Sequence, residues 1–186
     1  MIMKCFHLKT ILLVLAFAAS IFTSLNAAAD TAAGIDRDVN AVLNRLYAEV
    51  PSAKVIGQKA KGILVFTSIV KGGFLVGGQY GEGALLKGGK TDSYYSTLQV
   101  SYGLQAGLQK YGYAMFFMTD SAMNWLNKSD GWEVGVGPSI VVVDTGAATS
   151  MTTTTLQSDI YAFFFDQKGL MGGLGLQGTK ITKITK

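Results

Sequence analysis

Glycine residues divide most of the chain into short apolar segments, and this pattern constrains the fold more than any other sequence feature. The chain of 186 residues contains 23 glycines and only two prolines. Glycine-containing turn sequences at 87–90, 129–131 and 166–169 separate apolar runs, as expected of β-hairpins. Glycines also occur inside the runs, where they favour bulges or strong curvature. The predicted strands cover residues 62–70, 74–76, 83–87, 94–102, 113–119, 132–143, 152–165 and 170–177.

Helical periodicity is clear in one segment near the N-terminus. Apolar residues recur at helical spacing from Ile35 to Val50, and Pro51 ends the pattern. A second, shorter helix is predicted at 52–59, and a third at 121–128 with Thr119 or Asp120 as its N-cap. The predicted fold class is therefore α+β. It is a mainly antiparallel, glycine-rich β domain with an N-terminal amphipathic helix and a short inserted helix.

The first 29 residues have the features of a bacterial signal peptide. Lys4 and Lys9 precede an apolar run at 11–25, and Ala27 and Ala29 supply the small residues that a signal peptidase requires. The run is shorter than the roughly 18–20 residues that span a bilayer, although an uncleaved anchor is the alternative. We predict cleavage near Ala29 and a periplasmic or cell-envelope location. The predicted organisation is a signal peptide at 1–29, an N-terminal helical segment at 30–58 and a β-rich domain at 59–186.

Removal of the signal peptide narrows the available chemistry, because Cys5 and His7 are the only cysteine and histidine. Residues 30–186 therefore cannot form disulfides, thiolate or imidazole catalysts, or Cys/His metal sites. A G-x-G-x-x-G sequence at 173–178 is too close to the C-terminus to open a βαβ unit. We predict a non-enzymatic protein without a cofactor. A hydrolase using facing carboxylates, such as Asp130 with Glu133 or Asp159 with Asp166, is the remaining enzymatic alternative.

Charges are segregated along the chain. Six lysines between positions 54 and 90 accompany a single acid, Glu82, and the tail adds Lys180, Lys183 and Lys186. If the fold brings the two segments together, they form one cationic surface. Alternatively, the lysines are solvated residues that protect strand edges from aggregation.

Five segments in chain order carry a resemblance to a known family. They are AKG followed by an apolar run at 60–63, GGFLVGG and GEG at 72–83, SYGLQAG at 101–107, GP at 137–138, and the Y…KGLMGG…QG pattern from 161 to 178. This set resembles the SYLF family, also called the lipid-binding SYLF or yeast actin-binding-domain-like family, in its exported bacterial form.

The resemblance implies a membrane-associated protein. The best-known eukaryotic members bind phosphoinositides, and some also bind actin filaments, through a basic surface and an amphipathic helix. Carried over to this chain, the candidate lipid-binding residues are Lys54, Lys59, Lys61, Lys71, Lys87, Lys90 and Lys180. The helix that begins near Ile35 carries more acids than bases, so we expect it to pack on the core rather than on a membrane.

The implied partner is an anionic phospholipid surface, and no nucleic acid is expected. An exported bacterial protein meets little phosphoinositide and no actin, so phosphatidylglycerol or cardiolipin is the expected lipid. Binding through flexible lysines predicts weak lipid selectivity. The alternative function is a structural or protein-interaction module of the cell envelope that does not bind lipid.

Overall fold

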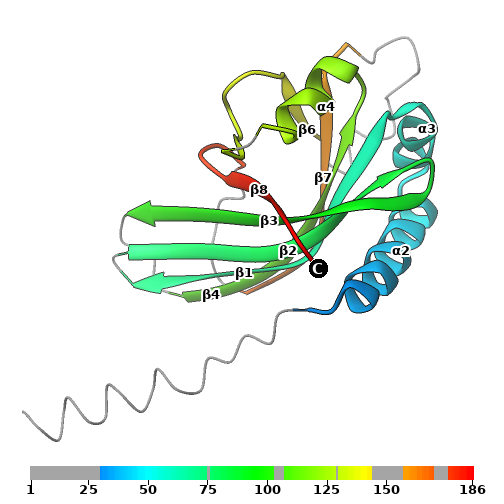
Figure 1. Ribbon diagram of the computed structural model, residues 1–186. Helices are drawn as coiled ribbons and strands as arrows, with labels where there is room; N and C mark the ends of the chain where they lie inside the picture. The colour runs from blue at the N-terminus through cyan, green and yellow to red at the C-terminus, as the bar shows by residue number, and fades with distance from the viewer. Residues whose placement is uncertain (1–29, 75, 103–106, 129, 144–156, 170–175) are drawn as a thin grey trace, which may run out of the picture. The chain divides into compact units, whose positions relative to one another are not determined.

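The computed structural model describes residues 30–74, 76–102, 107–128, 130–143, 157–169 and 176–186 (Figure 1). The predicted signal peptide lies outside these residues. Three helices are present in the described chain: α2 (Ala32–Glu49), α3 (Pro51–Lys59) and α4 (Asp120–Leu126). The strands are β1 (Gly62–Phe74), β2 (Val76–Lys87), β3 (Lys90–Tyr102), β4 (Gly107–Phe117), β5 (Trp132–Glu133), β6 (Ile140–Val143), β7 (Ile160–Gly169) and β8 (Lys180–Ile184).

The eight strands form one sheet in the order β5-β8-β3-β2-β1-β4-β7-β6. All neighbouring strands are antiparallel except β6 and β7, which are parallel. The long strands bend, so the sheet has a convex face that carries α2 and α3 and a concave face toward α4 and β8 (Figure 1). The expected α+β fold with a mainly antiparallel sheet is confirmed.

The helix α2 forms because its N-terminus is capped and one of its faces is apolar. The Thr31 side chain accepts a hydrogen bond from the Gly34 amide at 3.1 Å. Ile35, Val39 and Leu43 are buried against the convex face of the sheet. Pro51 then begins α3 at the first helical turn, where its missing amide proton costs nothing.

Side-chain alternation along the strands creates two separate cores. Leu64 and Phe66 of β1 belong to the core of the concave face, whereas Ile63 and Val65 belong to the core beneath α2 and α3. The central strands are therefore apolar on both faces near their helix-covered end, which explains their nearly continuous apolar runs. Phe116 packs on Phe163 in the convex core, with ring centroids 5.3 Å apart.

Several predicted strand limits were wrong, for identifiable reasons. The glycine pair at 72–73 does not end a strand, because it opposes the second pair at 77–78 across the longer β1–β2 hairpin. The predicted strand at 132–143 splits into β5 and β6, and Gly135 and Gly137 between them adopt positive φ. The turn predicted at 166–169 lies within β7, where Asp166 has a φ of 55° at a register shift. Residues 152–156 and 170–175 of the other predictions lie outside the described residues.

Candidate functional site

The convex face of the sheet is apolar and exposed beyond the region that α2 and α3 cover. Five large side chains contribute to this surface, which we call the apolar patch: Val70, Tyr80, Leu98, Val100 and Leu108. Their exposed fractions run from 47% for Tyr80 to 67% for Leu108. Contiguous exposed apolar surface is characteristic of an interaction site.

Strand register places the apolar patch on four neighbouring strands. Val70 of β1 opposes Tyr80 of β2, which in turn opposes Leu98 of β3. In the next row toward the strand ends, Val100 opposes Gly78 and Leu108 opposes Gly72. The two glycines add no side chain to the middle of the second row, and the Leu108 side chain extends toward Gly72.

Lysines flank the apolar patch on both sides. Lys180 of β8 opposes Leu98, while Lys110 of β4 opposes Val70 on the other side. Lys168 of β7 opposes Lys110 and extends the row outward. All three lysines are exposed, and none forms an ion pair among the described residues. One row across six strands therefore runs from a lysine, through three apolar side chains, to two more lysines.

The acid beside the apolar patch has its charge compensated. Glu82 forms an ion pair with Lys186 at 2.5 Å, and both side chains are 10% exposed. Its other carboxylate oxygen accepts a hydrogen bond from the Tyr80 hydroxyl at 2.7 Å. Burial, followed by the bond to Glu82 and its charge, raises the pKa of Tyr80 to about 12. Tyr80 is therefore neutral at physiological pH.

The seven lysines predicted from the sequence do not share one face. Lys54 of α3 and the turn glycines of the β2–β3 hairpin line a hollow of about 550 Å³, and Lys59 and Lys90 are also exposed at the helix-covered part of the fold. Lys61 pairs with Asp120 at 3.4 Å. Lys87 pairs with Asp92 at 3.1 Å, and a hydrogen bond from Ser93, assisted by this lysine, lowers the pKa of Asp92.

Lys71 and Lys180 lie away from that group. Lys180 borders the apolar patch, whereas Lys71 is buried on the concave face. Lys71 follows Ile69 at the two-residue period of a strand, so both side chains lie on the concave side. Lys71 therefore lies on the opposite face of the sheet from Lys180, and its role in lipid binding stays a prediction. Sequence reasoning also missed Lys110 and Lys168, because only strand register brings them beside Val70.

A row of long polar side chains crosses the concave face. Gln99, Gln79, Lys71 and Gln109 occupy opposing positions on β3, β2, β1 and β4, in that order. Gln79 Oε1 accepts a 2.5 Å hydrogen bond from the Tyr111 hydroxyl, and its Nε2 donates to Thr179 at 3.4 Å. Burial raises the pKa of Tyr111 to about 12, against the lowering effect of Gln79. Gln79 is thus fixed in its orientation.

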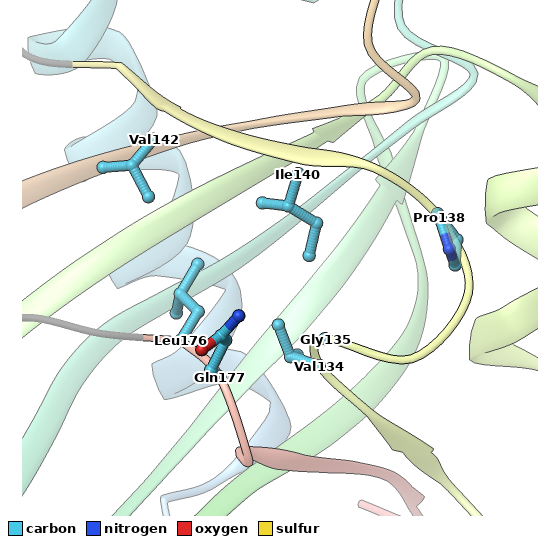
Figure 2. Close-up of a pocket in the computed structure, with 7 residues that line it drawn as sticks. All are labelled: Val134, Gly135, Pro138, Ile140, Val142, Leu176 and Gln177. Atoms are coloured by element: carbon cyan, nitrogen blue, oxygen red, sulfur yellow. The ribbon is translucent and has the colours of Figure 1, made fainter.

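An apolar pocket of about 410 Å³ opens on the same concave side (Figure 2). Its lining residues are Val134, Gly135, Pro138, Ile140, Val142, Leu176 and Gln177. Figure 2 shows the Leu176 and Gln177 side chains on one side of the pocket and Ile140 and Val142 on the other. Apart from the Gln177 amide, these side chains are apolar, which suits a hydrocarbon ligand.

Two of the four carboxylates considered for catalysis, Asp159 and Asp166, have structural partners. Asp166 pairs with Arg45 of α2. Asp159 accepts hydrogen bonds from the Ser139 amide and hydroxyl and from the Thr119 hydroxyl. These bonds, led by the one from the Ser139 amide, lower the pKa of Asp159. Both carboxylates hold neighbouring segments together.

The helices and the mainly antiparallel sheet define an α+β domain with an exposed apolar surface on the convex face. Residues 98–186 match the family model described as Ysc84, a Las17-binding protein actin regulator. This match confirms the resemblance to the SYLF family over residues 98–186. The chain matches no curated protein. Among the helices that the structure describes, none is long and apolar enough to cross a membrane.

Proposed function

We propose that the protein is a non-enzymatic domain that binds anionic phospholipid membranes through the apolar patch and its flanking lysines. The observation that supports this function best is the row from Lys180 through the apolar side chains to Lys110 and Lys168. Apolar side chains suit the acyl boundary of a bilayer, and lysines at the rim suit anionic head groups. Family membership favours a lipid- or actin-associated role.

The apolar patch supplies the larger part of the expected free energy. Full burial of one large apolar side chain is worth roughly 1.5–3 kcal/mol. The five side chains of the apolar patch are about half exposed, so their insertion would contribute on the order of 4–7 kcal/mol. Each lysine near an anionic surface adds about 1 kcal/mol, or about 3 kcal/mol for Lys110, Lys168 and Lys180. Together these terms are sufficient for reversible attachment.

The proposed lipid is a common anionic phospholipid such as phosphatidylglycerol or cardiolipin. The charges that flank the apolar patch are lysines, and flexible ammonium groups attract anionic head groups without selecting their shape. The proposed location is the cell envelope, following export with the predicted leader. The alternative is that a protein partner binds the apolar patch, because the description of the matching family names a protein-binding function.

Vesicle co-sedimentation of the protein, expressed from the full-length sequence, tests this proposal. Wild type is mixed with neutral phosphatidylcholine vesicles or with vesicles containing phosphatidylglycerol, at low and high salt. The test variant carries Lys110→Glu, Lys168→Glu and Lys180→Glu. The matched control carries Lys54→Glu, Lys59→Glu and Lys90→Glu, which change the same charge at exposed positions elsewhere.

The expected result is binding to anionic vesicles that the test variant loses and the control variant keeps. Loss in the control variant alone would move the site to the lysines around α3 and the β2–β3 hairpin and would refute the patch. Absence of wild-type binding to any vesicle would refute lipid binding and favour a protein partner for the same surface. A Leu108→Glu variant supports the test, because an exposed substitution leaves the cores intact.

A further inference from the structure

A polar hollow lies between α2, α3 and the turn that joins β2 to β3 (Figure 1). Its volume of about 550 Å³ is in the range of small-molecule sites. Five polar side chains from the two helices line it, and we call it the helix hollow: Asn40, Asn44, Tyr47, Lys54 and Gln58. The first three are spaced at i, i+4 and i+7 on α2, and the other two at i and i+4 on α3. Each helix therefore presents one polar edge to the same space.

The floor of the helix hollow is apolar. Leu43 of α2, Ile63 of β1 and Leu86 of β2 line it, and all three are buried in the core beneath the helices. At the β2–β3 turn the lining residues are Gly88 and Gly89, which carry no side chain and have open space around them. A ligand can therefore enter past the turn and rest on an apolar floor between two polar walls.

The amide side chains of the walls are available for hydrogen bonds. Asn44 and Gln58 form no side-chain hydrogen bond among the described residues, and Asn40 uses only its Nδ2, which donates to the Asp36 oxygen at 2.8 Å. An amide group can donate and accept at the same time, as can a sugar hydroxyl. The walls therefore match a ligand that carries several hydroxyl groups.

Tyr47 contributes a hydroxyl that the packing does not require. Its side chain is half-buried, and its hydroxyl has no hydrogen-bond partner in the described chain. Phenylalanine would keep the ring contact with Phe116, where the centroids are 6.4 Å apart. A Cβ at position 57 would lie 2.3 Å from the hydroxyl, so Gly57 leaves space for it, although glycine inside a helix is destabilising. Burial raises the pKa of Tyr47, so the hydroxyl stays protonated and can donate at neutral pH.

Lys54 supplies the charge of the helix hollow. It is the only charged residue among the described residues that line the hollow, and none of the ion pairs of the described chain includes it. An ammonium group without a neighbouring acid attracts an anion and forms charge-assisted hydrogen bonds with it. One cation matches the single charge of a carboxylate, whereas a phosphate monoester carries nearly two charges at neutral pH.

We infer that the helix hollow binds an acidic sugar, a pyranose ring that carries one carboxylate. The carboxylate pairs with Lys54 Nζ, and the ring hydroxyls bond to the Asn44 amide and the Tyr47 hydroxyl. The C–H face of the ring rests on the apolar floor. None of the described residues that line the hollow belongs to the apolar patch, so this site and the proposed membrane surface can exist independently.

Titration with glucuronate, followed by the amide NMR shifts of the protein, tests the inference. Glucose is the uncharged sugar, acetate the anion without a ring, and glucose 6-phosphate the sugar with a phosphate. An oligosaccharide of glucuronate residues distinguishes a polymer from the free sugar as the source of the ligand. The variants are Lys54→Met, Tyr47→Phe and Asn44→Ala, and Lys110→Met is the matched control for loss of one lysine charge elsewhere.

Wild type is expected to bind glucuronate with shifts in α2, α3 and the β2–β3 turn, and to bind glucose and acetate roughly fivefold more weakly. Lys54→Met should bind glucuronate only as well as glucose and leave glucose binding unchanged, because the ammonium group acts on the carboxylate alone. Tyr47→Phe and Asn44→Ala should weaken both sugars several-fold without lowering the unfolding temperature.

The control separates this inference from the proposed membrane binding. Lys110→Met should leave glucuronate binding unchanged and weaken vesicle binding, whereas Lys54→Met should do the reverse. Tighter binding of the oligosaccharide than of glucuronate would support a polymer as the ligand, and equal affinity would support the free sugar.

Three results would overturn the inference. The first is the absence of shifts around the helix hollow when folded wild type is titrated with millimolar glucuronate. The second is a Lys54→Met variant that still prefers glucuronate to glucose as strongly as wild type. The third is tighter binding of glucose 6-phosphate than of glucuronate, which would identify a phosphate site instead.

Discussion

Replacing Leu108 with serine is expected to weaken membrane binding by an amount that salt does not change. Leu108 is the most exposed apolar residue of the patch, at 67%. Full burial of a leucine is worth roughly 1.5–3 kcal/mol, so inserting the exposed two thirds contributes about 1–2 kcal/mol. This loss corresponds to an affinity about 5- to 30-fold lower. Hydrophobic transfer is not screened by ions, so the ratio of wild type to variant should be equal at low and high salt.

The opposite salt behaviour is expected for Lys110→Met on the same surface. Methionine keeps an unbranched side chain but removes the charge, which is worth about 1 kcal/mol near an anionic bilayer. The variant should bind about fivefold more weakly at low salt and nearly as well as wild type at high salt.

Vesicle partitioning separates these two contributions. Affinities for phosphatidylglycerol-containing vesicles are measured at several salt concentrations for wild type, Leu108→Ser and Lys110→Met. Val55→Ser is the control, because Val55 is an exposed valine on α3, away from the apolar patch. Equal affinities of Leu108→Ser and wild type, or a loss that disappears at high salt, would refute insertion of the apolar patch.

Three further predictions concern stability. Gly83→Ala should lower the free energy of unfolding by about 3 kcal/mol, because the new Cβ would lie 2.1 Å from the Val65 oxygen. Gly88→Ala should cost about 1 kcal/mol, because Gly88 lies in open space and only its φ of 57° disfavours alanine. Chemical denaturation compares the two variants, and equal losses would contradict the strand packing. Phe116→Ala should cost about 3–5 kcal/mol in the same assay, because Phe116 is fully buried beneath the helices, and a loss below 1 kcal/mol would argue against that packing. Asp159→Asn should cost about 1–2 kcal/mol at pH 7. The pKa of Asp159 is lower in the folded than in the unfolded protein, so its carboxylate stabilises the fold at pH values above the unfolded pKa near 4. This stabilisation is lost as the pH falls through the folded pKa. In acid denaturation profiles, the stability difference between Asp159→Asn and wild type should therefore disappear.

The sequence predicted the type of fold because the relevant signals are local. The helical spacing from Ile35 coincides with α2, and Thr119 caps α4 by accepting a bond from the Ala122 amide at 3.1 Å. The predicted strand limits were less accurate at glycine pairs, which can either end a strand or lie within one. The pair at 72–73 could end a strand or oppose another glycine pair within a hairpin, and only the pairing with 77–78 decides between them.

The candidate sites could not be predicted to the same extent. Lysine clustering along the chain favoured a binding surface at positions 54–90. In the structure, however, Lys110 of β4 and Lys168 of β7 lie beside the apolar patch. Side-chain alternation would have separated Lys71 from its neighbours only if the register shift between Phe66 and Ile69 had been known. A shift of one residue exchanges the two faces of a strand, and bulges are not visible in residue composition.

The sequence by itself determined the chemistry that this protein can use and the elements that it forms. Residues 30–186 contain neither cysteine nor histidine, and their apolar periodicity and glycine turns specify helices and antiparallel strands. The tertiary structure alone decided which residues act together. The pairing of β8, β3, β2, β1, β4 and β7 joins Lys180, Tyr80 and Lys168 in one row, although they are far apart in the chain. The physical reason is that a surface depends on strand order and register, which arise from contacts between distant segments.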